Sequence, residues 1–231
     1  GALISPAAVG RVAFMLRVQT GCEESCAYCI IPSTRGHGRS LAPAKVLRAV
    51  SYAADRGFRE VVLTGVHLGS YGRDLASSVT LMALLRALDG HRSDVTFRIS
   101  SLEPMDCPPE LVDLVASSGR FAPHFHLPLQ HASDTVLRRM RRPYSLDDYS
   151  RVVDRIRSLL PHAAIGSDLI AGFPGEREDD ANRTFDYVST SPLTYLHVFP
   201  YSPRAATEAS EFSGRVAGPL VRERARALRD V

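Results

Sequence analysis

The chain has 231 residues, 45% of them hydrophobic, and its 28 basic and 25 acidic side chains give a formal net charge of +3. A chain of this size can bury one sizeable core, so a single domain is expected. The nearly balanced charge permits contact with nucleic acid but does not argue for it. No apolar run of about 18 residues is present, which argues against a membrane span, and the first ten residues do not resemble a secretory signal.

The apolar pattern predicts short strands that alternate with helices. The strand-like runs are rich in β-branched and aromatic residues and are bounded by Gly, Pro or Ser. Helical stripes begin at Pro43, Leu81, Leu111, Tyr149 and Ala181. This alternation is typical of βαβ units and a parallel sheet, either doubly wound or a partial barrel. The six predicted strands are 13–19, 60–65, 95–100, 123–129, 163–172 and 193–199.

The domain organisation is expected to be simple. We predict a linker over residues 1–12, an α/β domain over 13–204, and a C-terminal extension with a helix over 205–231. The chain begins at Gly1 and stops within a helical pattern, so we expect a fragment of a longer protein.

Polar residues follow most of the predicted strands. In parallel α/β folds the chemistry lies at the carboxyl ends of the strands. Thr64 and Gly65 follow the second strand, Ser100 and Glu103 the third, and Gln130 the fourth. The fifth contains Asp168 and precedes "GFPGE". We expect these residues to converge on the side that carries the loop after the first strand.

That loop holds three of the four cysteines, Cys22, Cys26 and Cys29, spaced C-x3-C-x2-C. Such crowding is unlike a disulfide framework and favours a metal site in a reducing, cytoplasmic compartment. Structural zinc takes four ligands, and neither His37 nor Cys107 completes a common zinc pattern. A [4Fe–4S] cluster bound by three thiolates keeps one open iron, which suits catalysis better than electron transfer. Zinc, electron transfer and a catalytic cluster all remain open.

The motif C-x3-C-x-aromatic-C after a first strand resembles the signature of the radical S-adenosylmethionine (SAM) superfamily. The resemblance implies a partial (β/α)6 barrel of TIM-like shape, with a [4Fe–4S] cluster whose open iron is chelated by SAM. It also implies reductive cleavage of SAM to a 5′-deoxyadenosyl radical. The cofactors would then carry the chemistry, and the protein would bind, orient and shield them.

Further motifs resemble the central domain of the methylthiotransferases: "VVLTGVHLGSYG", "RISSLEP", "HFHLPLQHASDTVLRRMRRPYS", "SDLIAGFPGE" and "HVFPYSPR". "LTGVHLGSYG" is most similar to enzymes that act on threonylcarbamoyladenosine next to the tRNA anticodon. Relatives modify isopentenyladenosine in tRNA or an aspartate of a ribosomal protein. The resemblance implies tRNA and an electron donor such as a flavodoxin or ferredoxin as partners, and it does not indicate an oligomeric state. A different class, a zinc- or cluster-stabilised RNA-binding module, is the alternative.

The resemblance also implies roles for individual residues. Cys22, Cys26 and Cys29 would hold the catalytic cluster. Substrate contact is expected from Arg35, Arg39, His67 and Tyr71, although an ion pair is an equal alternative for the two arginines. Gly65 and Gly172 could instead be turn glycines, and Glu103 could cap the turn before Pro104. The residues expected to bind SAM are Tyr28, Thr64, Gly65, Ser100, Glu103, Gln130, Ile170 and Gly172.

Several features lie outside these roles. Full-length methylthiotransferases add an N-terminal domain with a second [4Fe–4S] cluster and a C-terminal RNA-binding barrel, so this chain is expected to cleave SAM without inserting sulfur. Asp168 could pair with an arginine inside the barrel. Of His124 and His126, one is expected to face the interior, and a core role is favoured. The run Arg138, Arg139, Arg141 and Arg142 predicts either a solvated helix face or contact with tRNA phosphates.

Overall fold

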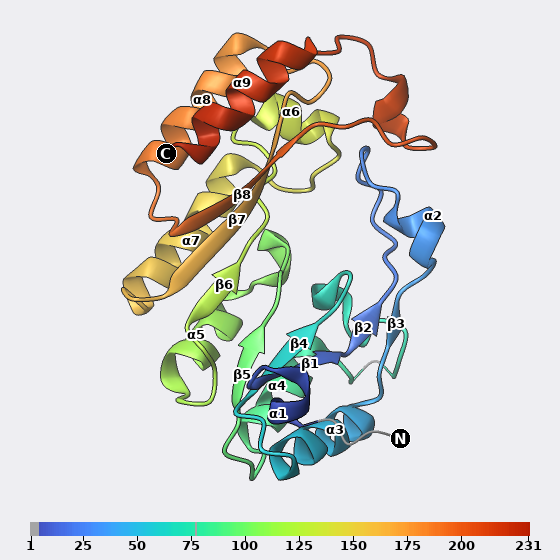
Figure 1. Cartoon of the computed structure of the whole chain (residues 1–231), viewed down its shortest axis with the longest axis vertical. Coiled ribbons are helices and arrows are strands. Elements are labelled where there is room, and N and C mark those ends of the chain that lie inside the picture. Colours follow the sequence, from blue (N-terminus) through green and yellow to red (C-terminus); the bar gives the residue numbers. More distant parts are fainter. Residues whose placement is uncertain (1–4, 77) are drawn as a thin grey trace.

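The computed structural model describes residues 5–76 and 78–231. Six parallel strands follow one another in chain order (Figure 1). One three-stranded sheet is β1-β4-β5 and the other is β6-β7-β8, and a bridge between Phe97 and Phe121 links them. Within the described residues β1 and β8 do not pair, so the barrel is open. The strands are β1 (Ala13–Arg17), β4 (Glu60–Thr64), β5 (Thr96–Ile99), β6 (His124–His126), β7 (Ala164–Ala171) and β8 (Tyr195–Pro200).

All six predicted strands are confirmed, with ends that differ by a few residues, and so is the partial-barrel fold class. A short antiparallel pair, β2 (Gln19–Thr20) and β3 (Arg39–Ser40), closes the base of the cysteine loop. The helices are α1 (Pro6–Val9), α2 (Ile31–Arg35), α3 (Pro43–Asp55), α4 (Leu81–Asp89), α5 (Pro109–Ser117), α6 (Asp134–Arg139), α7 (Leu146–Leu159), α8 (Glu178–Thr190) and α9 (Gly218–Arg229). The described residues also form the 3₁₀ turns η1 (Leu68–Ser70), η2 (Pro104–Asp106) and η3 (Glu208–Glu211).

The helices begin where the sequence supplies starting residues. Pro43 opens α3 because its fixed φ and missing N–H suit the first turn of a helix. Thr80 caps α4 by accepting a hydrogen bond from the backbone N–H of Ala83. Ser145 and Asp148 form a capping box at the start of α7. These local signals fix where each crossover helix turns back along the sheet.

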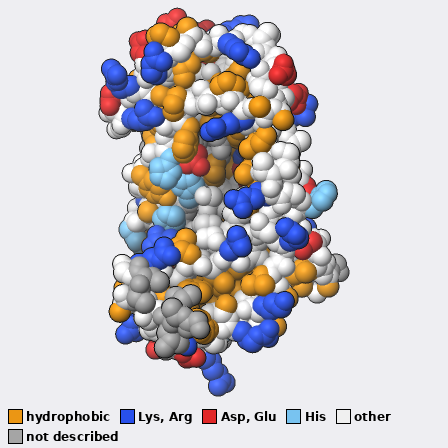
Figure 2. Space-filling view, turned by 45° about the vertical axis from the view of Figure 1, so that its right-hand side comes forward, with side chains coloured by type: hydrophobic (Ala, Val, Ile, Leu, Met, Phe, Trp, Pro, Cys, Tyr) orange, Lys and Arg blue, Asp and Glu red, His pale blue; other side chains and the backbone are white. Residues whose placement is uncertain are grey.

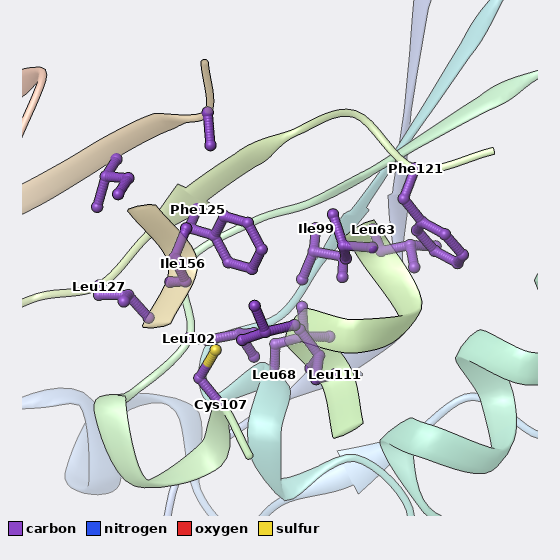
Figure 3. Packing of buried hydrophobic residues seen from close by; sticks show 14 of the residues in the cluster. Leu63, Leu68, Ile99, Leu102, Cys107, Leu111, Phe121, Phe125, Leu127 and Ile156 are labelled. Carbon is purple, nitrogen blue, oxygen red and sulfur yellow. The ribbon is translucent and has the colours of Figure 1, made fainter. Parts of the chain in front are cut away.

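The main core lies between the strands and the crossover helices (Figure 3). Leu63, Ile99 and Phe125 project from the strands toward Leu68 and Leu111. Burying each such side chain stabilises the fold by about 1.5–3 kcal/mol. This packing holds the carboxyl ends of the strands at fixed positions relative to one another.

A second, smaller core supports the cysteine loop. Its buried members come from that loop, from α6, from the segment after β7 and from η3, and Tyr28, Ile170, Tyr201 and Phe212 pack against it. Two distant parts of the chain, the loop near α2 and the segment around η3, therefore lie side by side at the open end of the barrel (Figure 1). The buried members are Ala27, Val136, Met140, Phe173 and Ala209.

The last helix packs closely on the sheet. Val221, Ala225 and Leu228 of α9 are buried. Gly172 has φ +78°, and a Cβ added there would lie 2.5 Å from Cγ2 of Val221. A side chain at residue 172 would therefore displace α9, so this glycine is required both by its backbone conformation and by the helix above it.

Candidate functional site

The cysteine loop closes on itself at its base. Gly21 has φ +76°, and a Cβ at this position would lie 1.9 Å from the carbonyl oxygen of His37. The backbone N–H of Cys22 donates to the carbonyl of Gly36 at 3.0 Å. Cys22, Cys26 and Cys29 carry free, partly exposed thiols on this loop. Glycine at residue 21 is thus what allows the two ends of the loop to cross.

Residues far along the chain hold the tip of the loop. The backbone N–H of Ala27 donates to Met140 at 3.0 Å, and the N–H of Ala209 donates to Ala27 at 2.8 Å. The ring of Tyr28 meets Phe173 edge to face, with centroids 6.3 Å apart. Burial raises the pKa of Tyr28, so its hydroxyl stays protonated. The tip of the loop is thereby fixed to the far side of the barrel mouth.

Arg142 joins the loop to the end of β5. Its guanidinium is buried, donates to Sγ of Cys26 at 3.1 Å and to the hydroxyl of Tyr144 at 3.0 Å, and forms an ion pair with Glu103. Burial raises the pKa of Cys26, and the positive charge of Arg142 opposes that shift. The carboxylate of Glu103 therefore holds this guanidinium in place. The alternative role of Glu103 as a cap is not supported, because its side chain makes no capping hydrogen bond to the turn at Pro104.

The expectation of a solvated basic run is wrong for Arg142, which is buried, whereas Arg138 and Arg141 are exposed. Arg142 is buried, Arg139 donates to the carbonyls of Pro174 and Ser213, and Arg141 pairs with Glu208. Arg138 is exposed and donates to the hydroxyl of Thr135. The run mainly fastens α6 to the loops around the barrel mouth.

His67 lies against the first cysteine. Its Nδ1 is 3.8 Å from Sγ of Cys22, and its Nε2 is 2.7 Å from Oδ2 of Asp106. Burial opposes protonation, but the hydrogen bond to Asp106 and the contact with Cys22 raise the pKa of His67 to about 9. For Cys22, burial is outweighed by His67 and by the N–H of Glu24, so its pKa is lowered. A thiolate at Cys22 is stabilised by this arrangement.

The predicted residues at the ends of β4 and β5 lie close to this loop. Thr64 and Ser100 are half-buried, and the N–H of Ser100 donates to Leu63 at 3.1 Å. A Cβ on Gly65 would lie 2.9 Å from Cα of Leu68 and 3.0 Å from Oε1 of Gln19. The glycine at residue 65 is thus explained by close packing of the strand end against η1.

Ile170 lies on β7, and Gln130, which follows β6, pairs with β7 through an isolated bridge to Leu169. Gln130 has φ +67°, its N–H donates to Asp168 at 2.8 Å, and its carbonyl accepts from Ile170 at 2.9 Å. Ile170 is half-buried in the second core, and the N–H of Gly172 donates to Oε2 of Glu176 at 2.6 Å. A left-handed backbone at a glutamine is uncommon and marks Gln130 as a constrained position.

The residues expected to touch substrate are separated by the fold. Arg35 at the end of α2 and Arg39 on β3 are exposed. His67 is buried beside Cys22, as described above. Tyr71 is 2% exposed, and its hydroxyl donates to the carbonyl of Leu41 at 2.6 Å. Tyr71 therefore belongs to the core, and a substrate contact is not retained for it.

Sequence reasoning missed two residues that shape this site. Oε1 of Gln19 accepts from the N–H of His67 at 2.8 Å, and its Nε2 donates to the carbonyl of Gly21 at 2.8 Å. Asp106 holds His67 from η2, as described above. Gln19 adjoins the cysteine motif, and this adjacency could have identified it from the sequence. No sequence pattern identifies Asp106.

A second polar group lies inside the barrel. His124 and His126 both contact the hydroxyl of Tyr195, at 2.9 and 3.1 Å. The expectation that only one of these histidines faces the interior is wrong, because side chains two residues apart in a strand point to the same face. Asp168 contacts His126 and His197, so the expected arginine partner is replaced by two histidines.

The donor set of the cysteine loop fits a [4Fe–4S] cluster. Three thiols on one short loop are free, and His67 and Arg142 favour negative charge on two of them. Cys107, the fourth cysteine, is 3% exposed and belongs to the main core, as Figure 3 shows. Protein thiols therefore offer three ligands here, which leaves one coordination position of such a cluster for another ligand.

The comparisons with known proteins agree with this fold. Residues 16–188 match the family model described as the radical SAM superfamily. The radical S-adenosylmethionine methyltransferase TsrM of Kitasatospora setae, solved with cobalamin and a [4Fe–4S] cluster bound, is similar over 85% of this chain and 38% of its own, at a TM-score of 0.70 and 17% identity. Coproporphyrinogen III oxidase HemN of Escherichia coli covers 93% of this chain and 50% of its own at a TM-score of 0.66 and 15% identity. The chain therefore belongs to the radical SAM superfamily.

Among curated relatives, the threonylcarbamoyladenosine tRNA methylthiotransferase MtaB of Aquifex aeolicus is 38% identical over 94% of this chain and 52% of its own length. The ribosomal protein uS12 methylthiotransferase RimO of Acidothermus cellulolyticus is 39% identical over 90% of this chain and 44% of its own. A tRNA-2-methylthio-N(6)-dimethylallyladenosine synthase of Pelotomaculum thermopropionicum is 36% identical over 91% of this chain and 47% of its own length. The chain spans about half the length of these relatives. No described helix is long and apolar enough to cross a membrane.

Proposed function

We propose that this chain is the radical SAM domain of a tRNA methylthiotransferase that acts on threonylcarbamoyladenosine next to the anticodon. The observation that carries the proposal is the cysteine loop: three free thiols at the barrel mouth, two of them contacted by His67 and Arg142. The similarity to MtaB supports the substrate. None of the relatives named above supports the zinc- or cluster-stabilised RNA-binding module.

Cys22, Cys26 and Cys29 would hold a [4Fe–4S] cluster, and the cluster would supply the electron for reductive cleavage of SAM. His67 would act by keeping Cys22 in the thiolate form that binds iron. Arg142 would place a positive charge beside Cys26 and keep the loop tip in position through Glu103. These two residues are proposed as positioning residues, since each acts through a cysteine.

The SAM pocket is proposed to lie between the loop and the strand ends described above. In this proposal Thr64, Gly65, Ser100 and Gln130 bind the methionine and ribose parts of SAM, and Tyr28, Ile170 and Gly172 back its adenine. Glu103 would contribute indirectly, because its carboxylate is engaged by Arg142. Arg35 and Arg39, which are exposed beside the loop, remain candidates for contact with a phosphate or carboxylate of the substrate.

The proposal also names partners. The full reaction would need tRNA, an electron donor such as a flavodoxin or ferredoxin, and a second [4Fe–4S] cluster held by residues outside this chain. A reducing, cytoplasmic compartment is inferred from the free thiols.

A ribosomal-protein aspartate is the second candidate substrate, because the RimO relative has essentially the same identity as the MtaB relative. Mass spectrometry of tRNA nucleosides from cells that lack the gene separates the candidates. Loss of the methylthio form of threonylcarbamoyladenosine supports the proposal. Loss of the methylthio form of dimethylallyladenosine assigns the other tRNA substrate. Unchanged tRNA nucleosides reject both tRNA substrates and favour the ribosomal-protein aspartate.

Anaerobic reconstitution tests the chemistry. The chain should bind about four irons and, with dithionite and SAM, release 5′-deoxyadenosine. Cys22→Ala should lose the iron and the product, because two thiolates cannot hold the cluster. Cys107→Ala is the matched control and should keep both, since Cys107 lies in the core. One zinc per chain that is lost in Cys22→Ala, without release of 5′-deoxyadenosine by the parent chain, would reject the proposal.

A further inference from the structure

A group of histidines lies on the inner face of the second sheet, on β6 and β8. Strand register places Asp168 opposite His197 and places Gly166 opposite both His126 and Tyr195. Side chains two residues apart share a face, so His124, His126, Asp168, Tyr195 and His197 all point into the barrel. Figure 2 shows histidine and acidic side chains gathered beside a hollow in the surface.

Three of these side chains offer ligand atoms to a common point. Nε2 of His126 lies 2.9 Å from Oδ1 of Asp168, and Nδ1 of His197 lies 3.1 Å from the same oxygen. The three atoms all lie within 4.8 Å of one another. Two imidazole nitrogens and one carboxylate oxygen form a donor set that binds zinc and other divalent transition metals. We propose that His126, Asp168 and His197 form a divalent transition-metal site inside the barrel.

The neighbours of His126 fit this assignment. A metal at Nε2 requires the proton of the neutral ring to be on Nδ1, and Nδ1 lies 3.1 Å from the hydroxyl of Tyr195. That hydroxyl can accept this proton's hydrogen bond and donate its own to Nε2 of His124 at 2.9 Å. Metal-binding histidines usually carry such a partner on the second nitrogen, which fixes the tautomer and the ring orientation.

Gly166 makes room for that partner. A Cβ at residue 166 would lie 2.0 Å from Cζ of Tyr195. The ring of Tyr195 therefore lies directly over the glycine, between His124 and His126. The absence of a side chain at residue 166 is what permits the hydroxyl to reach His126.

The site is open on one side. The side chain of His126 is 8% exposed and that of Asp168 is 24% exposed, whereas that of His197 is 55% exposed. Three protein ligands with access from one side are typical of metal sites that keep a position for water or substrate. The two histidine–aspartate hydrogen bonds occupy the same three atoms, so metal binding replaces them and leaves the second-nitrogen contact of His126 in place.

Zinc titration calorimetry tests the site. The background is Cys22→Ala/Cys26→Ala/Cys29→Ala, which removes thiol binding. We expect one zinc per chain, and at least a tenfold loss of affinity in His197→Ala. Tyr195→Phe, which removes only the hydroxyl, should weaken zinc about tenfold because it frees the second nitrogen of His126. His162→Ala is the control, since His162 is exposed and lies outside the cluster.

The outcomes are decisive in both directions. No saturable zinc binding, or affinity unchanged in both His197→Ala and Tyr195→Phe, would mean a hydrogen-bonded network without a metal and would overturn the site. Circular dichroism of each variant checks its folding. If the triple variant does not fold, the same titration is carried out on the chain with its thiols blocked by methyl methanethiosulfonate. The result is independent of whether the cysteine loop cleaves SAM.

Discussion

The cysteine loop and the interior histidine group obtain their chemistry in opposite ways. The three cysteines lie within eight residues of sequence (Cys22 to Cys29), whereas the histidine group draws on strands that begin at His124, Ala164 and Tyr195. Spacing along the chain defines the first, and register between parallel strands defines the second. The difference teaches that local sequence can identify a ligand set, while topology alone can assemble one without any motif.

The two regions differ again in what holds them. The histidine group lies on three paired strands of one sheet. The cysteine loop has little regular structure of its own and depends on Met140, Arg142 and Ala209 from the second half of the chain. The motif in the first half is thus positioned by the second half, and the first prediction tests this dependence.

Arg142→Met should have the largest effect. It removes a buried cation, leaves Glu103 without its ion-pair partner and removes the contact that holds Cys26 of the loop. Loss of one member of a buried ion pair costs about 3 kcal/mol of unfolding free energy, and iron binding on reconstitution should weaken as well. Urea denaturation and iron analysis measure the two effects.

Arg138→Ala is the matched control from the same basic run. Arg138 is exposed, so its replacement should change the unfolding free energy by less than about 0.5 kcal/mol. Equal stability and equal iron content in the two variants would show that the loop does not depend on Arg142.

These arginines also show the limit of prediction from sequence. The six strands and their order follow from short β-branched runs and regular spacing, which are local properties. "RRMRRPY" has the composition of a solvated surface, and nothing local separates Arg138, which is exposed, from Arg142, which is buried. Their difference arises because α6 ends against the cysteine loop, a contact between residues over 100 positions apart in sequence.

The same reasoning applies to the interior group. Asp168 was recognisable as a polar residue within a strand, but its partners depend on which strand pairs with β7 and in which register. His126 and His197 are 71 residues apart in sequence. No pattern along the chain connects them, so the candidate metal site becomes visible only in three dimensions.

Gly166→Ala should have an intermediate effect, confined to the second region. The new Cβ collides with the ring of Tyr195, and such overpacking costs about 1–3 kcal/mol. Gly119→Ala is the control, because a Cβ there meets nothing within 4 Å and the backbone conformation is unstrained. Urea denaturation should separate the two variants. Equal stability would mean that Tyr195 moves aside freely and does not fix His126.

Asp180→Asn should have the smallest effect, and its effect should depend on pH. Oδ1 of Asp180 accepts from the hydroxyl of Ser133 at 2.5 Å, and Oδ2 accepts from the N–H of Arg177 at 2.9 Å. Burial opposes ionisation, but these two hydrogen bonds outweigh it and lower the pKa of Asp180. The bonds link the loop after β6 to the first turn of α8, in the half of the barrel that carries the histidine group.

Because the folded-state pKa is below the ordinary value of about 3.9, the ionised carboxylate contributes stability above that value. The contribution is lost as the pH falls through the folded-state pKa. Asp180→Asn should therefore lower the unfolding free energy by about 0.5–1 kcal/mol at neutral pH, a modest amount because the residue is only half-buried and solvent weakens its interactions. At a pH below the folded-state pKa of Asp180 the variant and the parent should converge. Asp179→Asn removes the same charge from an exposed neighbour in the same turn. If the two variants show the same pH dependence, the effect arises from general charge and not from the hydrogen bonds to Ser133 and Arg177.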